Sequence, residues 1–139
     1  MVDINVIIRK ISSVRKYLKL LENYKKYSRQ EIESDATLRG SAERYLYLAC
    51  QAAIDLGEAV ISFKNFRKPG TYSEIFYILG EEKVVSQEFE EKLANMAKFR
   101  NIVAHDYDNL DFGIIYKAII EDINDLSEFA DIIEKYLNL

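Results

Sequence analysis

The chain has 139 residues, of which 49% are hydrophobic and 30% charged, with five glycines, one proline and a formal net charge of −4. This length predicts one domain over residues 1–139, and the shortage of helix-breaking residues predicts an all-α fold. The negative charge excludes a global positive field that attracts nucleic acid. Any RNA contact therefore has to come from a local basic patch, from two subunits together or from a partner.

The counts of metal-binding residues exclude several further classes. One cysteine and one histidine cannot form a structural zinc site or a di-iron centre, and we expect no cofactor, although magnesium held by carboxylates stays open. No apolar run approaches the ~20 residues of a membrane span, and the N-terminus lacks the layout of a signal peptide. A cytoplasmic protein without a membrane partner is the expectation.

Apolar residues at intervals of three and four predict helices through most of the chain. The first runs from Ile4 to Arg29, and the second from Thr37 to Phe63 with Asp35 as its N-cap. The first helix is predicted to bury Ile4, Ile7, Ile8, Ile11, Val14, Leu18 and Leu21. The second is predicted to bury Leu38, Ala42, Tyr45, Ala49, Ala52, Leu56, Ala59 and Phe63, whose small members let a neighbouring helix approach closely.

The pair Pro69-Gly70 marks the segment 64–71 as a turn between helices. A short helix follows, capped by Thr71 or Ser73 and ending near Gly80.

Two more helices complete the predicted bundle. One opens at Ser86 or Gln87 and ends near His105, and the segment from Asp106 to Asp111 has the Asp and Asn content of a loop. The last helix starts with Asp111 as its cap and carries the apolar residues Ile114, Ile115, Ala118, Ile119, Ile123, Leu126, Phe129, Ile133 and Leu137. The predicted architecture is an up-and-down bundle of four to five helices.

The only histidine, His105, lies five residues after Arg100. Histidine titrates near neutral pH unaided, and arginine supplies a fork-shaped cation that matches a phosphate. This combination suits RNA cleavage without a metal. His105 would act as base on a ribose 2′-hydroxyl or as acid toward the leaving 5′-oxygen, and Arg100 would hold the scissile phosphate.

Helical spacing decides which of these residues are neighbours. Asn101 and His105 are four apart and share a face, so the Asn101 amide is a candidate for orienting the imidazole. Arg100 and His105 converge only if the last turn loosens or another element, such as a second subunit, completes the site. A histidine at a helix end is also common as a C-cap, and spacing alone leaves both interpretations open.

Three other groups of residues have simpler interpretations. A polar stripe on the second helix is typical of a solvated face, although it could line a cleft: Gln51, Asp55, Glu58 and Ser62. A basic stretch is more typical of a solubilising surface than of an RNA contact: Lys16, Lys19, Lys25, Lys26 and Arg29. Cys50 is predicted to be a core thiol.

Arg100, His105 and Tyr107 match an Arg-x4-His-x-Tyr motif, and the chain resembles the HepT-like toxins, a branch of the HEPN superfamily. Asn101 after the arginine and the run 41–57 resemble the family pattern as well. The short segment 71–79, the motif helix and the acidic last helix follow in the family's order, so the resemblance covers essentially the whole chain.

The resemblance implies a homodimeric helical bundle whose two motifs line one cleft. It implies a metal-independent ribonuclease toxin of a type VII-like toxin–antitoxin system, with Arg100 and His105 catalytic and Asn101 orienting the base. It further implies that a minimal nucleotidyltransferase antitoxin silences the toxin by transferring AMP to Tyr107. A bulky anion two residues from His105 would block the substrate and pair with Arg100.

Two alternatives stay open at this point. A non-catalytic helical bundle that docks a nucleotidyltransferase and assists its substrate binding would fit the net charge of −4 better. A dimeric structural module with a coincidental motif is the other.

Overall fold

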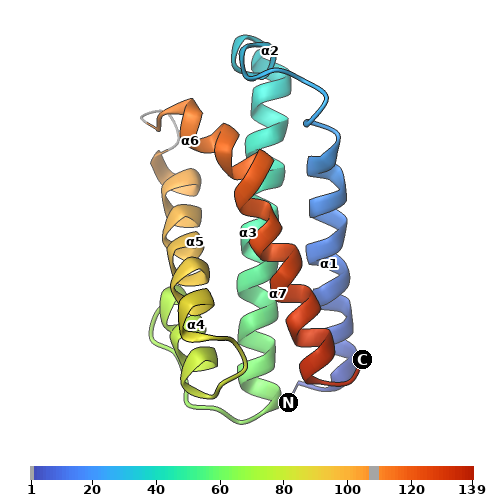
Figure 1. The fold of residues 1–139 in the computed structure, drawn as a ribbon, viewed down its shortest axis with the longest axis vertical. Coiled ribbons are helices and arrows are strands. Elements are labelled where there is room, and N and C mark those ends of the chain that lie inside the picture. The colour runs from blue at the N-terminus through green and yellow to red at the C-terminus, as the bar shows by residue number, and fades with distance from the viewer. Residues whose placement is uncertain (1, 107–109) are drawn as a thin grey trace.

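The computed structural model describes residues 2–106 and 110–139, and every regular element within them is a helix. In chain order the elements are α1 (Ile4–Glu22), α2 (Arg29–Ser34), α3 (Ala36–Phe63), α4 (Tyr72–Glu81), α5 (Gln87–Asp106), α6 (Phe112–Lys117), the π-helical turn η2 (Ala118–Asp122) and α7 (Ile123–Tyr136). The long helices run up and down the molecule, with α3 between α1 and α5 and with α7 crossing in front (Figure 1). The predicted all-α bundle is confirmed.

The central helix is α3, because apolar or small side chains cover most of its circumference. Ala42, Ala49 and Ala53 are completely buried, and α1 packs along this helix as the small residues predict. Among the described residues α3 is the one helix whose length and composition match a membrane span. However, 61% of the matching window is buried inside the bundle, as expected of a core helix.

Side-chain caps explain where the helices begin. The Asp35 carboxylate accepts from the backbone N–H of Leu38 at 3.0 Å, and the Thr71 hydroxyl accepts from that of Glu74 at 3.1 Å. Asp111 caps α6 in the same way. At the start of α5 the cap is the hydroxyl of Ser86, which accepts from the backbone of residue 89 at 3.1 Å.

The first helix is shorter than predicted, since α1 ends at Glu22 rather than near Arg29. The chain turns so that Tyr24 is buried, and its hydroxyl lies 2.7 Å from Ser41 Oγ on α3. A new helix, α2, then begins at a capping box formed by Ser28 and Glu31. The Ser-x-x-Glu signal of this capping box is visible in the sequence, and the first helix is predicted to continue past Ser28 although its apolar residues end at Leu21.

The apolar stripes also include two residues that the bundle leaves in solvent. Ile8 on α1 is 44% exposed, so the prediction that it is buried is wrong, and Ile114 on α6, an apolar residue of the last predicted helix, is 49% exposed. Both stand next to a buried isoleucine, Ile7 and Ile115, and a stripe of isoleucines is wider than the face that packs.

The helix predicted after Asp111 is interrupted by the π-helical turn η2. Across this turn Lys117 Nζ, at the end of α6, and Asp122 Oδ1, at the end of η2, form an ion pair at 3.1 Å, although the residues are five apart in the chain. A π-helical turn bonds residue i to i+5 and so brings such a pair together, which an α-helix does not.

Candidate functional site

The guanidinium of Arg100 faces α3 and is held at three nitrogens. Its Nε donates to Gln51 Oε1, one terminal nitrogen donates to the Tyr47 hydroxyl and the other to Asn101 Oδ1, each at 2.8 Å. We call Tyr47, Gln51 and Asn101 the Arg100 clasp. A guanidinium has five N–H groups, so the clasp leaves one N–H on each terminal nitrogen, which suits the fork-like binding of a phosphate.

Two aromatic rings and one carboxylate support this arrangement. The guanidinium carbon of Arg100 lies 4.8 Å from the ring centroid of Tyr47 and 5.4 Å from that of Tyr72, the first residue of α4. The amide nitrogen of Gln51 donates to Asp55 Oδ1 at 2.8 Å, which fixes the amide with its oxygen toward Arg100. The cation is therefore positioned by side chains from α3, α4 and α5.

The other motif residues are placed differently. His105 is exposed in the last turn of α5, which stays α-helical through Asp106. The last turn therefore does not loosen, and Arg100 and His105 point about 140° apart around the helix. The predicted contact between Asn101 and His105 stays a prediction, because the described contact of the Asn101 amide oxygen is with Arg100. Tyr107 lies outside the described residues.

The interpretation of the polar stripe as a solvated face is wrong for half of its members. Gln51 and Asp55 are half-buried and build the Arg100 site, whereas Glu58 and Ser62 are exposed as predicted. Tyr47 was missed by sequence reasoning. Its spacing of four from Gln51 was the available signal, since both then lie on one face of the helix.

The two remaining candidates are the basic stretch, which lies away from Arg100, and the buried Cys50. The basic residues 16, 19, 25, 26 and 29 are exposed on α1, the following turn and α2, and α1 and α5 lie on opposite sides of α3 (Figure 1). Cys50 is 2% exposed, which confirms the predicted core thiol. Burial raises the pKa of its thiol to about 12.

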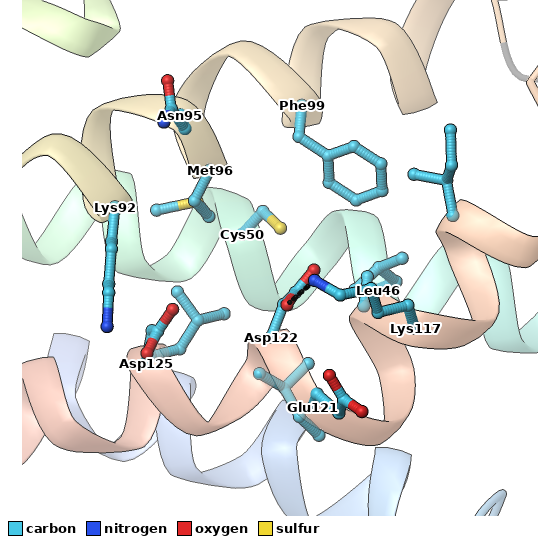
Figure 2. Close-up of a pocket in the computed structure, with 14 residues that line it drawn as sticks. Leu46, Cys50, Lys92, Asn95, Met96, Phe99, Lys117, Glu121, Asp122 and Asp125 are labelled. Atoms are coloured by element: carbon cyan, nitrogen blue, oxygen red, sulfur yellow. Dashed lines mark hydrogen bonds and ion pairs between the residues drawn. The ribbon is translucent and has the colours of Figure 1, made fainter.

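A cavity of about 580 Å³ lies between α5, α3 and the segment from α6 to α7. Figure 2 shows the Lys117–Asp122 ion pair on one wall and Lys92, Asn95, Met96 and Phe99 of α5 on another. Burial and the neighbouring Asp122 and Glu128 raise the pKa of Asp125 there, while Lys92 and Lys117 lower it. Arg100, Asn101 and His105 do not line this cavity.

The described residues contain no group of three or more His, Cys, Asp and Glu side chains placed to hold a metal ion. The Arg100 site offers instead a fixed cation, amide and hydroxyl groups, and an imidazole on the same helix. Such a set can bind a phosphate and transfer protons.

Residues 14–133 match the protein family described as Ribonuclease HepT-like. The mRNA nuclease HepT of Shewanella oneidensis is 25% identical over 130 residues, which cover 94% of this chain and 97% of that protein. The tRNA nuclease HepT of Aphanizomenon flos-aquae is 26% identical over 132 residues, covering 95% and 90% respectively.

Solved structures agree with the sequence matches. The tri-AMPylated HEPN toxin of Shewanella oneidensis in complex with the MNT antitoxin superposes with a TM-score of 0.85 at 25% identity, covering 94% of this chain and 97% of that one. The cytosolic protein YutE from Bacillus subtilis superposes with a TM-score of 0.83 at 25% identity, covering 98% and 91%. Because the family match spans most of its length, the chain belongs to the ribonuclease HepT-like family.

Proposed function

We propose that this protein is a metal-independent endoribonuclease and the toxin of a type VII-like toxin–antitoxin pair. The observation that carries the proposal is the Arg100 clasp, because it fixes a cation whose free N–H groups suit a phosphate. The relatives named mRNA nuclease and tRNA nuclease support RNA as the substrate class.

The reaction is a transphosphorylation at one internucleotide linkage. His105 takes the proton of the ribose 2′-hydroxyl, and the 2′-oxygen forms a bond to phosphorus while the bond to the 5′-oxygen breaks. The leaving 5′-oxygen receives that proton from the resulting His105 imidazolium, and the free N–H groups of Arg100 stabilise the charge that develops on the phosphate oxygens. Asn101 accepts a hydrogen bond from the Arg100 guanidinium, and its amide also orients His105, the general base of the reaction.

The active cleft lies between two copies of the chain. Arg100 faces α3 while His105 points about 140° away on a helix that stays regular, so one chain does not direct both groups at one phosphate. The exposed Ile102, on the turn between them, is 44% accessible and offers apolar surface for the second copy. We therefore propose a homodimer in which each motif contributes to a shared cleft.

The partner is a minimal nucleotidyltransferase antitoxin that transfers AMP to Tyr107. The solved structure of a relative supports this in two ways, because the HEPN toxin in it is tri-AMPylated and is in complex with an MNT antitoxin. An AMP group two residues after His105 adds bulk and negative charge beside the catalytic groups, where it excludes the RNA phosphate. We place the pair in the cytoplasm, in keeping with the cytosolic relative YutE.

The test is cleavage of total RNA by the purified protein in EDTA, after intact mass has shown that Tyr107 carries no AMP. Wild type is compared with His105→Ala and with Glu88→Ala, a control at an exposed position in the first turn of α5. We expect cleavage by wild type and by the control, and a loss of at least about 100-fold in His105→Ala.

Other outcomes point elsewhere. Equal cleavage by wild type and His105→Ala would overturn the assignment of His105. No cleavage by unmodified wild type would favour the non-catalytic partner that docks a nucleotidyltransferase, the function that the net charge of −4 suits better.

A further inference from the structure

We propose that a pocket beside the Arg100 clasp binds one RNA base next to the scissile phosphate, and that it selects guanine. This inference rests on the proposed nuclease function and assigns the substrate contact that the motif does not supply. The pocket measures about 380 Å³ and lies between α3, the start of α4 and α5. That volume falls within the range of small-ligand sites, roughly 300–1,000 Å³.

The pocket is continuous with the Arg100 site through two shared residues. Asn101 lines the pocket and accepts a hydrogen bond from Arg100 at 2.8 Å. Tyr72 lines it as well, and its ring centroid lies 5.4 Å from the guanidinium carbon. A phosphate bound by Arg100 therefore carries its neighbouring nucleoside to the mouth of this pocket.

The polar groups of the pocket match the edge of guanine. A guanidinium can only donate, so the Asn101 oxygen must face Arg100, and its amide nitrogen is the donor left for the pocket. Glu58 is exposed at the rim and has no ion-pair partner among the described residues, so its carboxylate is an acceptor. Guanine presents a carbonyl oxygen beside two adjacent N–H groups, which is the order that one donor and one carboxylate satisfy.

Stacking on Tyr72 supplies binding that does not depend on the base. The Tyr72 side chain is 37% exposed and lines the pocket. Every base has a flat face that can stack on an aromatic ring. Tyr72 therefore contributes affinity, whereas Glu58 and Asn101 contribute selection.

The wall formed by the link before α4 is held in place by the protein itself. The Glu74 carboxylate accepts from the backbone N–H of Gly70 at 3.2 Å and from Arg67 at 2.9 Å, and Arg67 also pairs with Glu81 at 3.1 Å. The Thr71 hydroxyl caps the helix that follows. A wall fixed before binding costs little conformational entropy when a base enters.

The experiment uses RNA oligonucleotides that differ only in the single base on either side of one cleavage point. We expect wild type to cut a guanine-containing member about tenfold faster at one of these two positions, the discrimination typical of a paired base edge. Glu58→Gln should abolish that preference while it leaves the rates on the other three bases within about twofold.

A second pair of variants tests the stacking surface. Tyr72→Ala should raise KM about tenfold for all four bases, the loss typical of one stacked base. Tyr136→Ala is the matched control, because that tyrosine is 36% exposed on α7 and lies outside the pocket. It should leave KM unchanged.

Binding of the same oligonucleotides with 2′-O-methyl ribose, measured by fluorescence anisotropy, separates this proposal from the nuclease proposal. Preferential binding of the guanine oligonucleotide that is lost in Glu58→Gln supports the pocket even if no RNA is cut. Equal affinity for all four bases, unchanged by Glu58→Gln, would overturn the pocket even if cleavage depends on His105.

Discussion

Arg100 is oriented by residues that its own motif does not contain. Two of the three members of the clasp, Tyr47 and Gln51, come from α3, and Asp55 holds Gln51 one turn further along. An arginine side chain has several rotatable bonds, and fixing them before the substrate binds removes an entropic cost from the transition state. The positioning residues are therefore expected to affect turnover more than substrate affinity.

The Tyr47 hydroxyl offers a direct test at the residue scale. Tyr47→Phe keeps the ring beside Arg100 but removes the acceptor, so we expect kcat to fall about tenfold with KM within about twofold. Tyr45→Phe is the matched control on the same helix, because Tyr45 is half-buried and not part of the clasp. A rise in KM alone, or an equal loss in both variants, would contradict the positioning role.

At the scale of elements, the packing of α4 on α3 depends on Gly57. A Cβ atom built on Gly57 would lie 2.7 Å from Cγ2 of Ile75 and 3.4 Å from Cε1 of Phe76. Both side chains are buried, so they have little room to move. Tyr72 begins α4, and the close approach at Gly57 thus also sets the wall of the base pocket.

Two glycine substitutions on the same helix should change stability in opposite directions. Gly57→Ala is expected to lower the free energy of unfolding by about 1–3 kcal/mol because the core is overpacked. Gly40→Ala meets no atom within 4 Å, so it should raise that free energy by about 0.5–1 kcal/mol through the better helix propensity of alanine. Urea unfolding of both variants measures this, and equal shifts would show that Gly57 is not a packing constraint.

Asp125, near the start of α7, makes the stability of this region depend on pH. Burial, Asp122 and Glu128 raise the pKa of its carboxyl group, whereas Lys92 and Lys117 lower it. The folded protein therefore keeps this proton at pH values where the unfolded chain, with a carboxyl pKa of about 3.9, has released it. The contribution of Asp125 to the free energy of unfolding is therefore fully present below about pH 3.9, and it is lost as the pH rises through the pKa that the group has in the folded protein.

Asp125→Asn should remove the loss of stability that occurs when Asp125 ionises in the folded protein. We expect the variant to be more stable than wild type at pH 7 by on the order of a few tenths of a kcal/mol, since the group is mostly solvated. The difference should disappear at pH 3, where both states of the wild type hold the proton. Thermal unfolding at the two pH values measures it, and a variant that is less stable at pH 7 would show that Asp125 makes a favourable ion pair instead.

At the scale of the whole molecule, the proposed dimer explains how an acidic chain can act on RNA. A net charge of −4 gives no general attraction for a phosphate backbone, so two Arg100 sites in one cleft would have to supply it locally. The same arrangement brings Arg100 of one copy near His105 of the other. This makes a prediction that no single-chain site makes.

Arg100→Ala and His105→Ala should each be inactive alone but partly active when mixed. If each site takes its arginine from one copy and its histidine from the other, a mixed dimer keeps one intact site, and random exchange restores about a quarter of wild-type activity. Mixing is verified by native mass spectrometry of the two variants. Mixed dimers without activity would show that both residues are needed from the same chain.

The amino-acid sequence by itself determined the helical fold, most helix starts and the residues of the motif. These depend on local chemistry, because Asp35, Thr71 and Asp111 cap the helices that directly follow them and an apolar stripe repeats within one helix. The family resemblance likewise rested on residues close together in the chain, and it was confirmed. The prediction differed from the structure at the capping box that starts α2, which lies inside the predicted first helix, and at the π-helical turn, which apolar spacing does not indicate.

The tertiary structure alone decided which way Arg100 points and what holds it. Gln51 and Arg100 are 49 residues apart, so their hydrogen bond exists only because α3 and α5 pack side by side. A polar stripe on an isolated helix looks the same whether it faces water or a neighbouring cation. Only the packed bundle distinguishes Gln51, which holds the guanidinium, and Asp55, which holds the Gln51 amide, from Glu58, which remains exposed at the rim of the adjoining pocket.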